Sequence, residues 1–173
     1  LLCDLGYESI CLDHFAKPED ALAKAAHART LHRNFQGYVP SSADALIGFG
    51  PSAISRLREG YAQNIPAVRT WARVVESGRL PTVRGHTQSA DDARREAIIE
   101  SLMCDLEVDL APFGGAAAFT ASLTALAPLA LDGLVEINGD IIRVPTNMRA
   151  FCRLVASAFD AYANAGTQHS KAI

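Results

Sequence analysis

Residues 31–38 combine the side chains that a small-molecule pocket needs. They read LHRNFQGY, so one cation, one imidazole, two side-chain amides and two aromatic rings gather around Gly37. A loop that only connects two elements needs turn-forming residues, and Gly37 alone would suffice for that. The residue types therefore predict a pocket at this segment, without indicating its ligand.

Asp13 and His14 form a second candidate pair, in the segment CLDHFAKP at the end of the first expected strand. In α/β architectures, ligand sites gather at the carboxyl ends of strands. His14 could act as the base of a catalytic dyad. It could equally be hydrogen-bonded to a neighbour and hold the loop. Both interpretations stay open, because the sequence indicates no nucleophile, and no catalytic residue is assigned.

Three further segments carry weaker signals. Residues 48–55, GFGPSAIS, follow an apolar run but match neither G-x-G-x-x-G nor the P-loop pattern. They are either a turn in which backbone packs closely or a backbone edge that lines a small-molecule site. Residues 61–64, YAQN, and 84–86, RGH, are polar and lie near expected helix ends, where solvation alone explains them. Arg84 could also meet a carboxylate as a bidentate fork.

The cysteines and histidines give no metal-binding pattern. No two of the four cysteines lie two to four residues apart, so neither zinc nor cluster spacing is present. Buried, reduced thiols are the expectation, and no metal ligand is predicted in this chain. The histidines show no H-x-x-x-H or H-E-x-x-H spacing; they are His14, His27, His32, His86 and His169.

Length and charge exclude several classes of protein. The chain has 173 residues, of which 49% are hydrophobic and 20% charged, which is typical of a folded protein. No Lys or Arg occurs in residues 96–142, so this half cannot neutralise phosphates and no nucleic-acid partner is expected. No apolar run reaches the ~20 residues of a membrane span, and we expect a cytoplasmic protein. The first residue is Leu1, within what resembles a helix end, which suggests a piece of a longer protein.

The periodicity of residues 1–80 predicts an alternation of strands and helices. Residues 7–15 are expected to form one buried strand, and Pro18 to open a helix. Residues 45–55 are expected to be a short buried strand that runs into a glycine-rich turn. Residues 56–80 are expected to be helical, with Gly78 just past the helix end.

A second domain is predicted from residue 81 onward. A capping box at residues 89–92 starts a helix, Gly114 and Gly115 precede a second one, and Pro128 is expected to end or kink it. Residues 134–144 predict a hairpin that turns at Asn138 and Gly139, followed by a last helix. This order resembles a winged-helix domain, but the second helix, AAAFTASLTALA, carries no cation to contact DNA.

These segments together resemble one family. In chain order they are LDHFAKPEDALA, LHRNFQGY, GFGPSAIS, YAQN, RG, SADDARREAIIESLMC and LAPLALDGLVEI. They resemble oxygen-independent coproporphyrinogen III oxidase, the radical S-adenosylmethionine dehydrogenase of haem biosynthesis, over nearly the whole chain. A related family of radical-SAM haem chaperones shares this layout but usually differs around NFQGY, so the resemblance favours the oxidase. A non-catalytic haem- or porphyrin-binding module, as in the chaperones, is the alternative.

The resemblance implies a fold, an activity and a division into domains. Residues 1–80 would be the last strands and helices of a partial (β/α) radical-SAM barrel, and residues 81–173 a mainly helical, winged-helix-like domain, giving an α+β chain. The family binds S-adenosylmethionine and a 4Fe-4S cluster and converts two propionates of coproporphyrinogen III to vinyls. The cluster ligands lie in an N-terminal barrel portion that this chain lacks, so the isolated chain is expected to be inactive.

The resemblance also implies roles for individual residues. Gln36, Ile54 and Phe35 match positions that line the S-adenosylmethionine site, and Arg33 would pair with a substrate propionate. The acidic C-terminal half would cover the site rather than attract an anionic substrate. Two positions depart from the family pattern, which usually has glycine where Cys11 stands and valine where Pro51 stands.

Overall fold

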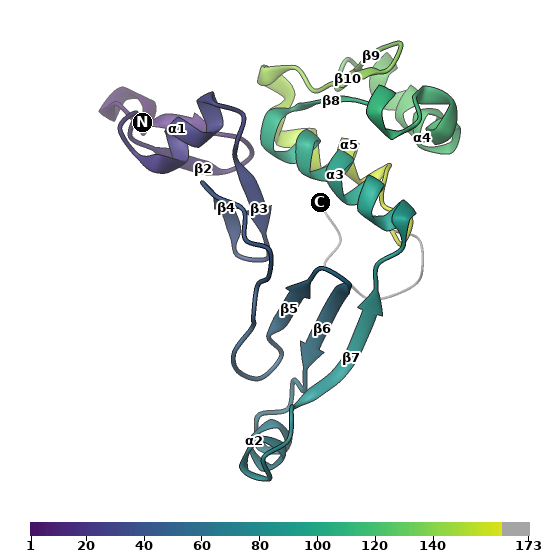
Figure 1. Ribbon diagram of the computed structural model, residues 1–173. Coiled ribbons are helices and arrows are strands. Elements are labelled where there is room, and N and C mark those ends of the chain that lie inside the picture. The colour runs from purple at the N-terminus through teal and green to yellow at the C-terminus, as the bar shows by residue number, and fades with distance from the viewer. Residues whose placement is uncertain (164–173) are drawn as a thin grey trace. The chain divides into compact units, whose positions relative to one another are not determined.

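The computed structural model describes residues 1–163 of the chain, and it divides into two compact units. The first unit comprises Leu1–Ser41 and Asp91–Ile173, and the second comprises Ser42–Ala90. Both units mix short strands with helices (Figure 1), which confirms the expected α+β class. All strand pairs among the described residues are antiparallel. The partial barrel and the boundary between residues 80 and 81 therefore stay predictions.

The N-terminal part of the first unit consists of two hairpins and a helix. Strands β1 (Glu8–Ile10) and β2 (His14–Ala16) pair with Ile10 opposite His14. Helix α1 (Ala21–His27) follows and is capped by Asp20, and β3 (His32–Asn34) then pairs with β4 (Gly37–Val39). The predicted single strand over residues 7–15 is wrong. Residues 11–13 form a turn that begins at Cys11, whose φ is +47°.

The C-terminal part of the first unit is built on α3 (Ala90–Asp105). Strand β8 (Glu107–Asp109) pairs with β10 (Ile141–Arg143), which pairs in turn with β9 (Glu136–Asn138). Helix α4 (Thr120–Leu131) continues past Pro128, and the last helix, α5, is short (Cys152–Ser157). The predicted hairpin is confirmed, but its turn lies one residue later than expected. Because Asn138 pairs with Ile141, the turn residues are Gly139 and Asp140.

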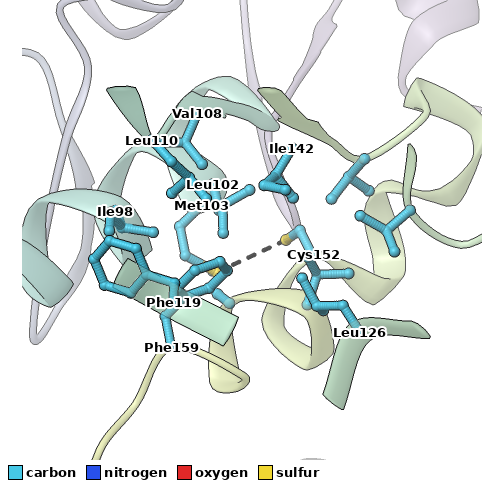
Figure 2. Packing of buried hydrophobic residues seen from close by; sticks show 14 residues of the cluster. Ile98, Leu102, Met103, Val108, Leu110, Phe119, Leu126, Ile142, Cys152 and Phe159 are labelled. Atoms are coloured by element: carbon cyan, nitrogen blue, oxygen red, sulfur yellow. Dashed lines mark hydrogen bonds between the residues drawn. The ribbon is translucent and has the colours of Figure 1, made fainter. Parts of the chain in front are cut away.

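The larger hydrophobic core lies between α3, the three-stranded sheet, α4 and α5 (Figure 2). Helix α3 contributes buried side chains such as Ile98 and Leu102, both 0% exposed. The sulfur atoms of Met103 and Cys152 are 3.8 Å apart. Phe119 and Phe159 meet edge to face at 5.8 Å between ring centroids, a favourable aromatic geometry. The core thus fixes α3 against the strands and helices that follow it.

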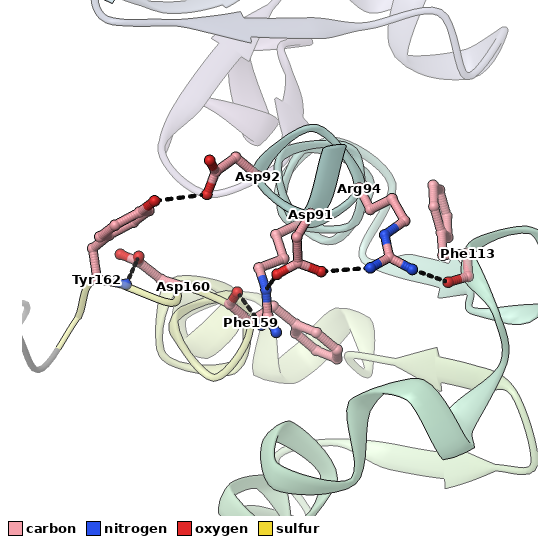
Figure 3. A network of polar contacts seen from close by, with 8 residues as sticks. Asp91, Asp92, Arg94, Phe113, Phe159, Asp160 and Tyr162 are labelled. Atoms are coloured by element: carbon pink, nitrogen blue, oxygen red, sulfur yellow. Dashed lines mark hydrogen bonds and ion pairs between the residues drawn. The ribbon is translucent and has the colours of Figure 1, made fainter. Parts of the chain in front are cut away.

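A polar network secures the first turns of α3 (Figure 3). Asp91 accepts hydrogen bonds from Arg95 Nε at 2.6 Å and from Arg94 at 2.7 Å. Arg95 also donates to the carbonyl of Phe159 at 3.0 Å, which ties the C-terminal segment to the helix. The hydrogen bond from Arg95, aided by the charges of both arginines, lowers the pKa of Asp91 below its usual value.

The second unit is a three-stranded sheet with one helix. Its strands are β5 (Ile54–Leu57), β6 (Gly60–Asn64) and β7 (Thr82–Thr87), in the order β5-β6-β7, and α2 spans Val68–Glu76. The predicted helix over residues 56–80 is wrong before residue 68, although Gly78 follows its end as expected. Gly60, at φ +140°, allows β7 to approach β6. A Cβ there would lie 2.0 Å from the carbonyl oxygen of His86.

Residues 45–55 contain the predicted glycine-rich turn, but the short buried strand predicted before it is wrong. Leu46 forms an isolated bridge with Arg56, and the chain then makes a loop that reaches β5 at Ile54. Ile47 and Phe49 are exposed in this loop. The apolar run therefore does not mark a buried strand here, because its large side chains face solvent.

Candidate functional site

The segment LHRNFQGY forms the β3–β4 hairpin of the first unit. Asn34 pairs with Gly37, so Phe35 and Gln36 are the two turn residues. The backbone N–H of Gln36 donates to Asn34 Oδ1 at 2.8 Å, a side-chain hydrogen bond that closes the turn. Phe35 is 55% exposed, and Gln36 is exposed beside it. The turn therefore presents an aromatic ring and a side-chain amide to a ligand.

Two constraints require glycine at position 37: the backbone conformation and the close approach of a neighbouring side chain. The φ of Gly37 is +142°, a conformation that other residues rarely adopt. A Cβ at this position would lie 2.9 Å from His14 Nε2 and 3.2 Å from its Cε1. The imidazole of His14 thus packs directly on the backbone that follows Gln36.

His14 is held in place by two neighbours. Its Nδ1 lies 2.8 Å from Asp13 Oδ1, and since a carboxylate only accepts, Nδ1 carries the donated proton. Its ring meets the ring of Tyr38 edge to face, with centroids 5.0 Å apart and planes at 88°. These contacts favour the interpretation that His14 holds the loop. The dyad interpretation gains no nucleophile from them.

Helix α3 anchors the other side of the hairpin. The Tyr38 side chain is buried, and its hydroxyl donates to the carbonyl of Met103 at 3.0 Å. Burial raises the pKa of Tyr38 above its usual value. Glu100 Oε1 accepts from the backbone N–H of Arg33 at 3.2 Å and lies 3.2 Å from His32 Nδ1. One carboxylate of α3 therefore bonds two consecutive residues of β3.

Arg33, the predicted substrate ligand, is exposed on this hairpin. Its guanidinium carbon lies 5.5 Å from the centroid of the Tyr38 ring, within the range of a cation–π contact. Arg33, Phe35 and Gln36 are thus brought together on a single turn and the strand that leads into it. Their assignment to substrate and S-adenosylmethionine stays a prediction.

Ile54, the fourth predicted site residue, belongs to the second unit, where it begins β5 and is partly buried. The glycine loop before it is held by side chains of β6. Asn64 Nδ2 donates to the carbonyls of Gly50 at 2.9 Å and Gly48 at 3.3 Å. Gln63 Nε2 donates to the carbonyl of Ser52 at 3.2 Å. The segments GFGPSAIS and YAQN therefore form one structure, in which backbone packs closely.

Close packing explains why one of the two glycines in that loop, Gly48, is needed. A Cβ there would lie 2.6 Å from the carbonyl oxygen of Ile54, so only glycine fits. Pro51, a departure from the family pattern, is followed by Ser52 at φ +61°. Ser52 keeps its backbone hydrogen bond to the carbonyl of Ile65 at 3.1 Å, so the loop closes with proline in place.

The cysteines do not form a metal site in the part of the chain that the structure describes. No group of three or more His, Cys, Asp and Glu residues there could hold a metal ion. Cys11 Sγ donates to the carbonyl of Cys104 at 2.8 Å, and burial raises the pKa of Cys11 to about 12. Cys104 and Cys152 are buried, as expected for structural thiols, whereas Cys3 is exposed. His169 lies outside the described residues.

Sequence reasoning missed Glu100 and the carbonyl of Met103. Glu100 lies 67 residues from Arg33 in the chain, and nothing in the local pattern of α3 marks it. The only available signal was its position on the helix opposite the predicted apolar residues. Gln63 and Asn64 were noted, but as solvated residues at a helix end rather than as strand residues.

Comparison with known proteins confirms the resemblance. Residues 88–147 match the family HemN C-terminal domain. The chain is 42% identical to an oxygen-independent coproporphyrinogen III oxidase of Bradyrhizobium diazoefficiens and 41% identical to one of Paracoccus denitrificans. These alignments cover 99% and 97% of this chain but only 40% and 38% of the relatives. The chain thus spans about two fifths of the length of the relatives it matches.

A solved structure gives the same result. The radical SAM enzyme coproporphyrinogen III oxidase (HemN) from Escherichia coli superposes with a TM-score of 0.85 at 38% identity. The match covers 93% of this chain and 38% of that enzyme. By fold and sequence, the chain is thus related to radical SAM enzymes. Specifically, it resembles the C-terminal part of oxygen-independent coproporphyrinogen III oxidases. Among residues 1–163, no helix is long and apolar enough to cross a membrane.

Proposed function

We propose that this chain is the C-terminal portion of an enzyme that oxidatively decarboxylates two propionates of coproporphyrinogen III to vinyl groups, giving protoporphyrinogen IX. The observation that carries the proposal is the β3–β4 turn. It presents Phe35 and Gln36 side by side, in a chain 42% identical to part of a coproporphyrinogen III oxidase. The same proposal covers the barrel origin of residues 1–80, the winged-helix-like arrangement of residues 81–173 and a cytoplasmic location.

The chain's own residues fit S-adenosylmethionine but not an iron–sulfur cluster. The described residues offer no ligand group for a metal, so the cluster would be held by the portion of the enzyme outside this chain. When bound there, S-adenosylmethionine and the cluster would supply the radical chemistry needed to oxidise a propionate side chain. The side-chain amide of Gln36 forms no hydrogen bond with other described residues. It can therefore donate to the methionine carboxylate and accept from the ammonium.

The remaining residues would bind and orient. Phe35 offers an apolar ring at the turn, and the role of Ile54, which begins β5, is carried by the family resemblance alone. The guanidinium of Arg33 could form a bidentate pair with a propionate carboxylate. None of these side chains transfers a proton in the proposal. Their contribution is to place the two reactants and to exclude water.

A chimera tests the proposal. The N-terminal portion of the Bradyrhizobium relative is joined ahead of this chain, its cluster is reconstituted without oxygen, and S-adenosylmethionine cleavage and protoporphyrinogen formation are measured. We expect both activities, and we expect Gln36→Ala to raise the KM for S-adenosylmethionine about tenfold or more, since a hydrogen bond to a charged group contributes about 1.5–3 kcal/mol. Gln88→Ala is the matched control, because Gln88 is a glutamine of the second unit that lies outside both the β3–β4 hairpin and the loop before Ile54.

Two results would refute the proposal. The first is a chimera with an intact cluster that cleaves no S-adenosylmethionine. The second is stoichiometric haemin binding with axial ligation and no turnover, which would favour the non-catalytic porphyrin-binding alternative. The isolated 173-residue chain, by contrast, is expected to hold no cluster and to show no turnover.

A further inference from the structure

The hairpin that carries Phe35 and Gln36 packs as one unit with the C-terminal domain. Residues 1–41 form a compact unit with the residues after 91, whereas the intervening residues 42–90 form their own unit. Helix α3 lies within residues 88–147, the range that matches the HemN C-terminal domain. The C-terminal domain therefore packs with this hairpin directly. The covering role that the sequence predicts for this domain does not account for that packing.

Helix α3 contributes to two separate hydrophobic clusters. Ile98 and Leu102 belong to the large core of the C-terminal part. Cys104 belongs to the smaller cluster, which includes Leu31 and Tyr38 from the hairpin region. The core of the C-terminal part therefore fixes the position of α3, and α3 in turn forms part of the surface on which the hairpin packs.

Two polar ties fix the hairpin more closely. Tyr38 donates to the carbonyl of Met103 in the buried interface, at 3.0 Å. Glu100 binds β3 through the backbone N–H of Arg33 and through the side chain of His32, both at 3.2 Å. The bond to the backbone N–H of Arg33 fixes the strand itself, and Arg33 lies three residues before Gln36 in the chain. These ties fall on both strands of the hairpin, β3 and β4.

We propose that α3 of the C-terminal domain is a positioning element for the β3–β4 hairpin, with Glu100 as the positioning residue that acts through Gln36. Glu100 touches neither substrate nor cofactor in this proposal. It fixes β3 so that the turn holds Phe35 and Gln36 in one orientation. The proposal rests on the proposed function for the role of Gln36, but its structural half stands independently of any activity.

The first experiment measures amide hydrogen exchange in the full 173-residue chain. Glu100→Ala should accelerate exchange across residues 32–39 at least fivefold, while the amides of α4 change less than twofold. Glu100→Gln keeps an acceptor for the backbone N–H of Arg33 and should restore most of the protection. The control is Glu107→Ala, because Glu107 also joins the two parts of the unit, through Arg29 at 3.3 Å, but does not touch the hairpin.

The second experiment tests action through Gln36 in the chimera. Glu100→Ala should raise the KM for S-adenosylmethionine about fivefold with kcat changed less than twofold, and it should add no further increase when Gln36 is already alanine. Unchanged exchange at residues 32–39, or equal acceleration by Glu107→Ala, overturns the positioning role. Accelerated exchange with an unchanged KM instead overturns the proposed cofactor role of Gln36 and leaves the structural tie standing.

Discussion

Replacing Gly37 with alanine tests how His14 and the hairpin turn are packed together. The substitution has two costs that can be separated. The first is backbone strain, because φ at this position is +142°, and sparsely populated backbone conformations cost about 1–3 kcal/mol. The second is steric, because the new Cβ would lie 2.9 Å from His14 Nε2.

The steric cost follows from what holds His14. To make room, the imidazole must leave its hydrogen bond to Asp13, 2.8 Å long, or its edge-to-face contact with Tyr38 at 5.0 Å. The hydrogen bond between His14 and Asp13 is exposed and contributes about 0.5–1 kcal/mol. The aromatic contact contributes about 0.5–1.5 kcal/mol. Gly37→Ala should therefore lower the free energy of unfolding by about 2–4 kcal/mol in total.

The assay is urea unfolding of four proteins, followed by circular dichroism: the parent chain, Gly37→Ala, His14→Ala and the double variant. Removing the imidazole removes the clash, so Gly37→Ala should cost about 0.5–1.5 kcal/mol less in the His14→Ala background. Gly139→Ala is the matched control. Its φ is +63°, but no atom lies within 4 Å of the added Cβ, so only the backbone strain remains.

A coupling energy below about 0.3–0.5 kcal/mol between Gly37→Ala and His14→Ala, within the range expected of independent sites, would refute the packing argument. So would an equal coupling between His14→Ala and the Gly139→Ala control. A change in the m-value would show that the substitution alters the compactness of the folded or unfolded state, or breaks two-state unfolding, and not stability alone.

Two further predictions follow from the pKa shifts. Burial raises the pKa of Cys11 to about 12, so its thiol stays protonated at pH 8 and reacts slowly. Iodoacetamide should therefore label exposed Cys3 first, and peptide mapping that finds equal rates would contradict this. The pKa of Asp91 is lowered in the folded protein, so the ionised carboxylate stabilises the fold. This contribution is complete above the ordinary pKa of about 3.9 and is lost as pH falls through the pKa of Asp91 in the folded state. The stability difference between the parent chain and Asp91→Asn should therefore shrink on acidification to pH 2 in urea titrations, and a constant difference would contradict the assignment.

Local patterns predicted the elements that depend on near neighbours in the chain. The helix after Ser89 and the C-terminal hairpin were both expected and are both present. The hairpin turn was misplaced by one residue, because register depends on pairing with β8 as well as on the turn residues. The pocket predicted at residues 31–38 stays a prediction, because this segment forms a hairpin whose turn is exposed. Its anchors on α3 could not be predicted from the local pattern.

The failures in residues 42–80 share a physical cause. The apolar residues of this segment predict a buried strand and a helix face, although Ile47 and Phe49 are exposed in a loop. Gly60 lies inside the helix predicted over residues 56–80, whereas the structure needs it where two strands approach closely. The partner that requires this glycine is the carbonyl of His86, 26 residues further along the chain. Periodicity alone cannot reveal such long-range contacts.

The departure from the family pattern at Cys11 can be explained by the backbone. Cys11 has a φ of +47°, where a side chain costs about 1–2 kcal/mol and glycine fits freely. The glycine that the family usually has is thus the residue that the turn between β1 and β2 favours. Cysteine offsets the strain by burying its thiol and donating to the carbonyl of Cys104 at 2.8 Å. This hydrogen bond connects the turn to α3.

Cys11→Gly should therefore change stability little. It relieves the backbone strain, but it loses the thiol contact and adds about 0.5–1 kcal/mol of unfolded-state entropy. We expect a net change within about 1 kcal/mol in urea unfolding. Cys11→Ala is the control, since it loses the thiol contact and keeps the strain, and it should be less stable than Cys11→Gly. The opposite order would show that the turn at this position is not strained and that the family's glycine has another cause.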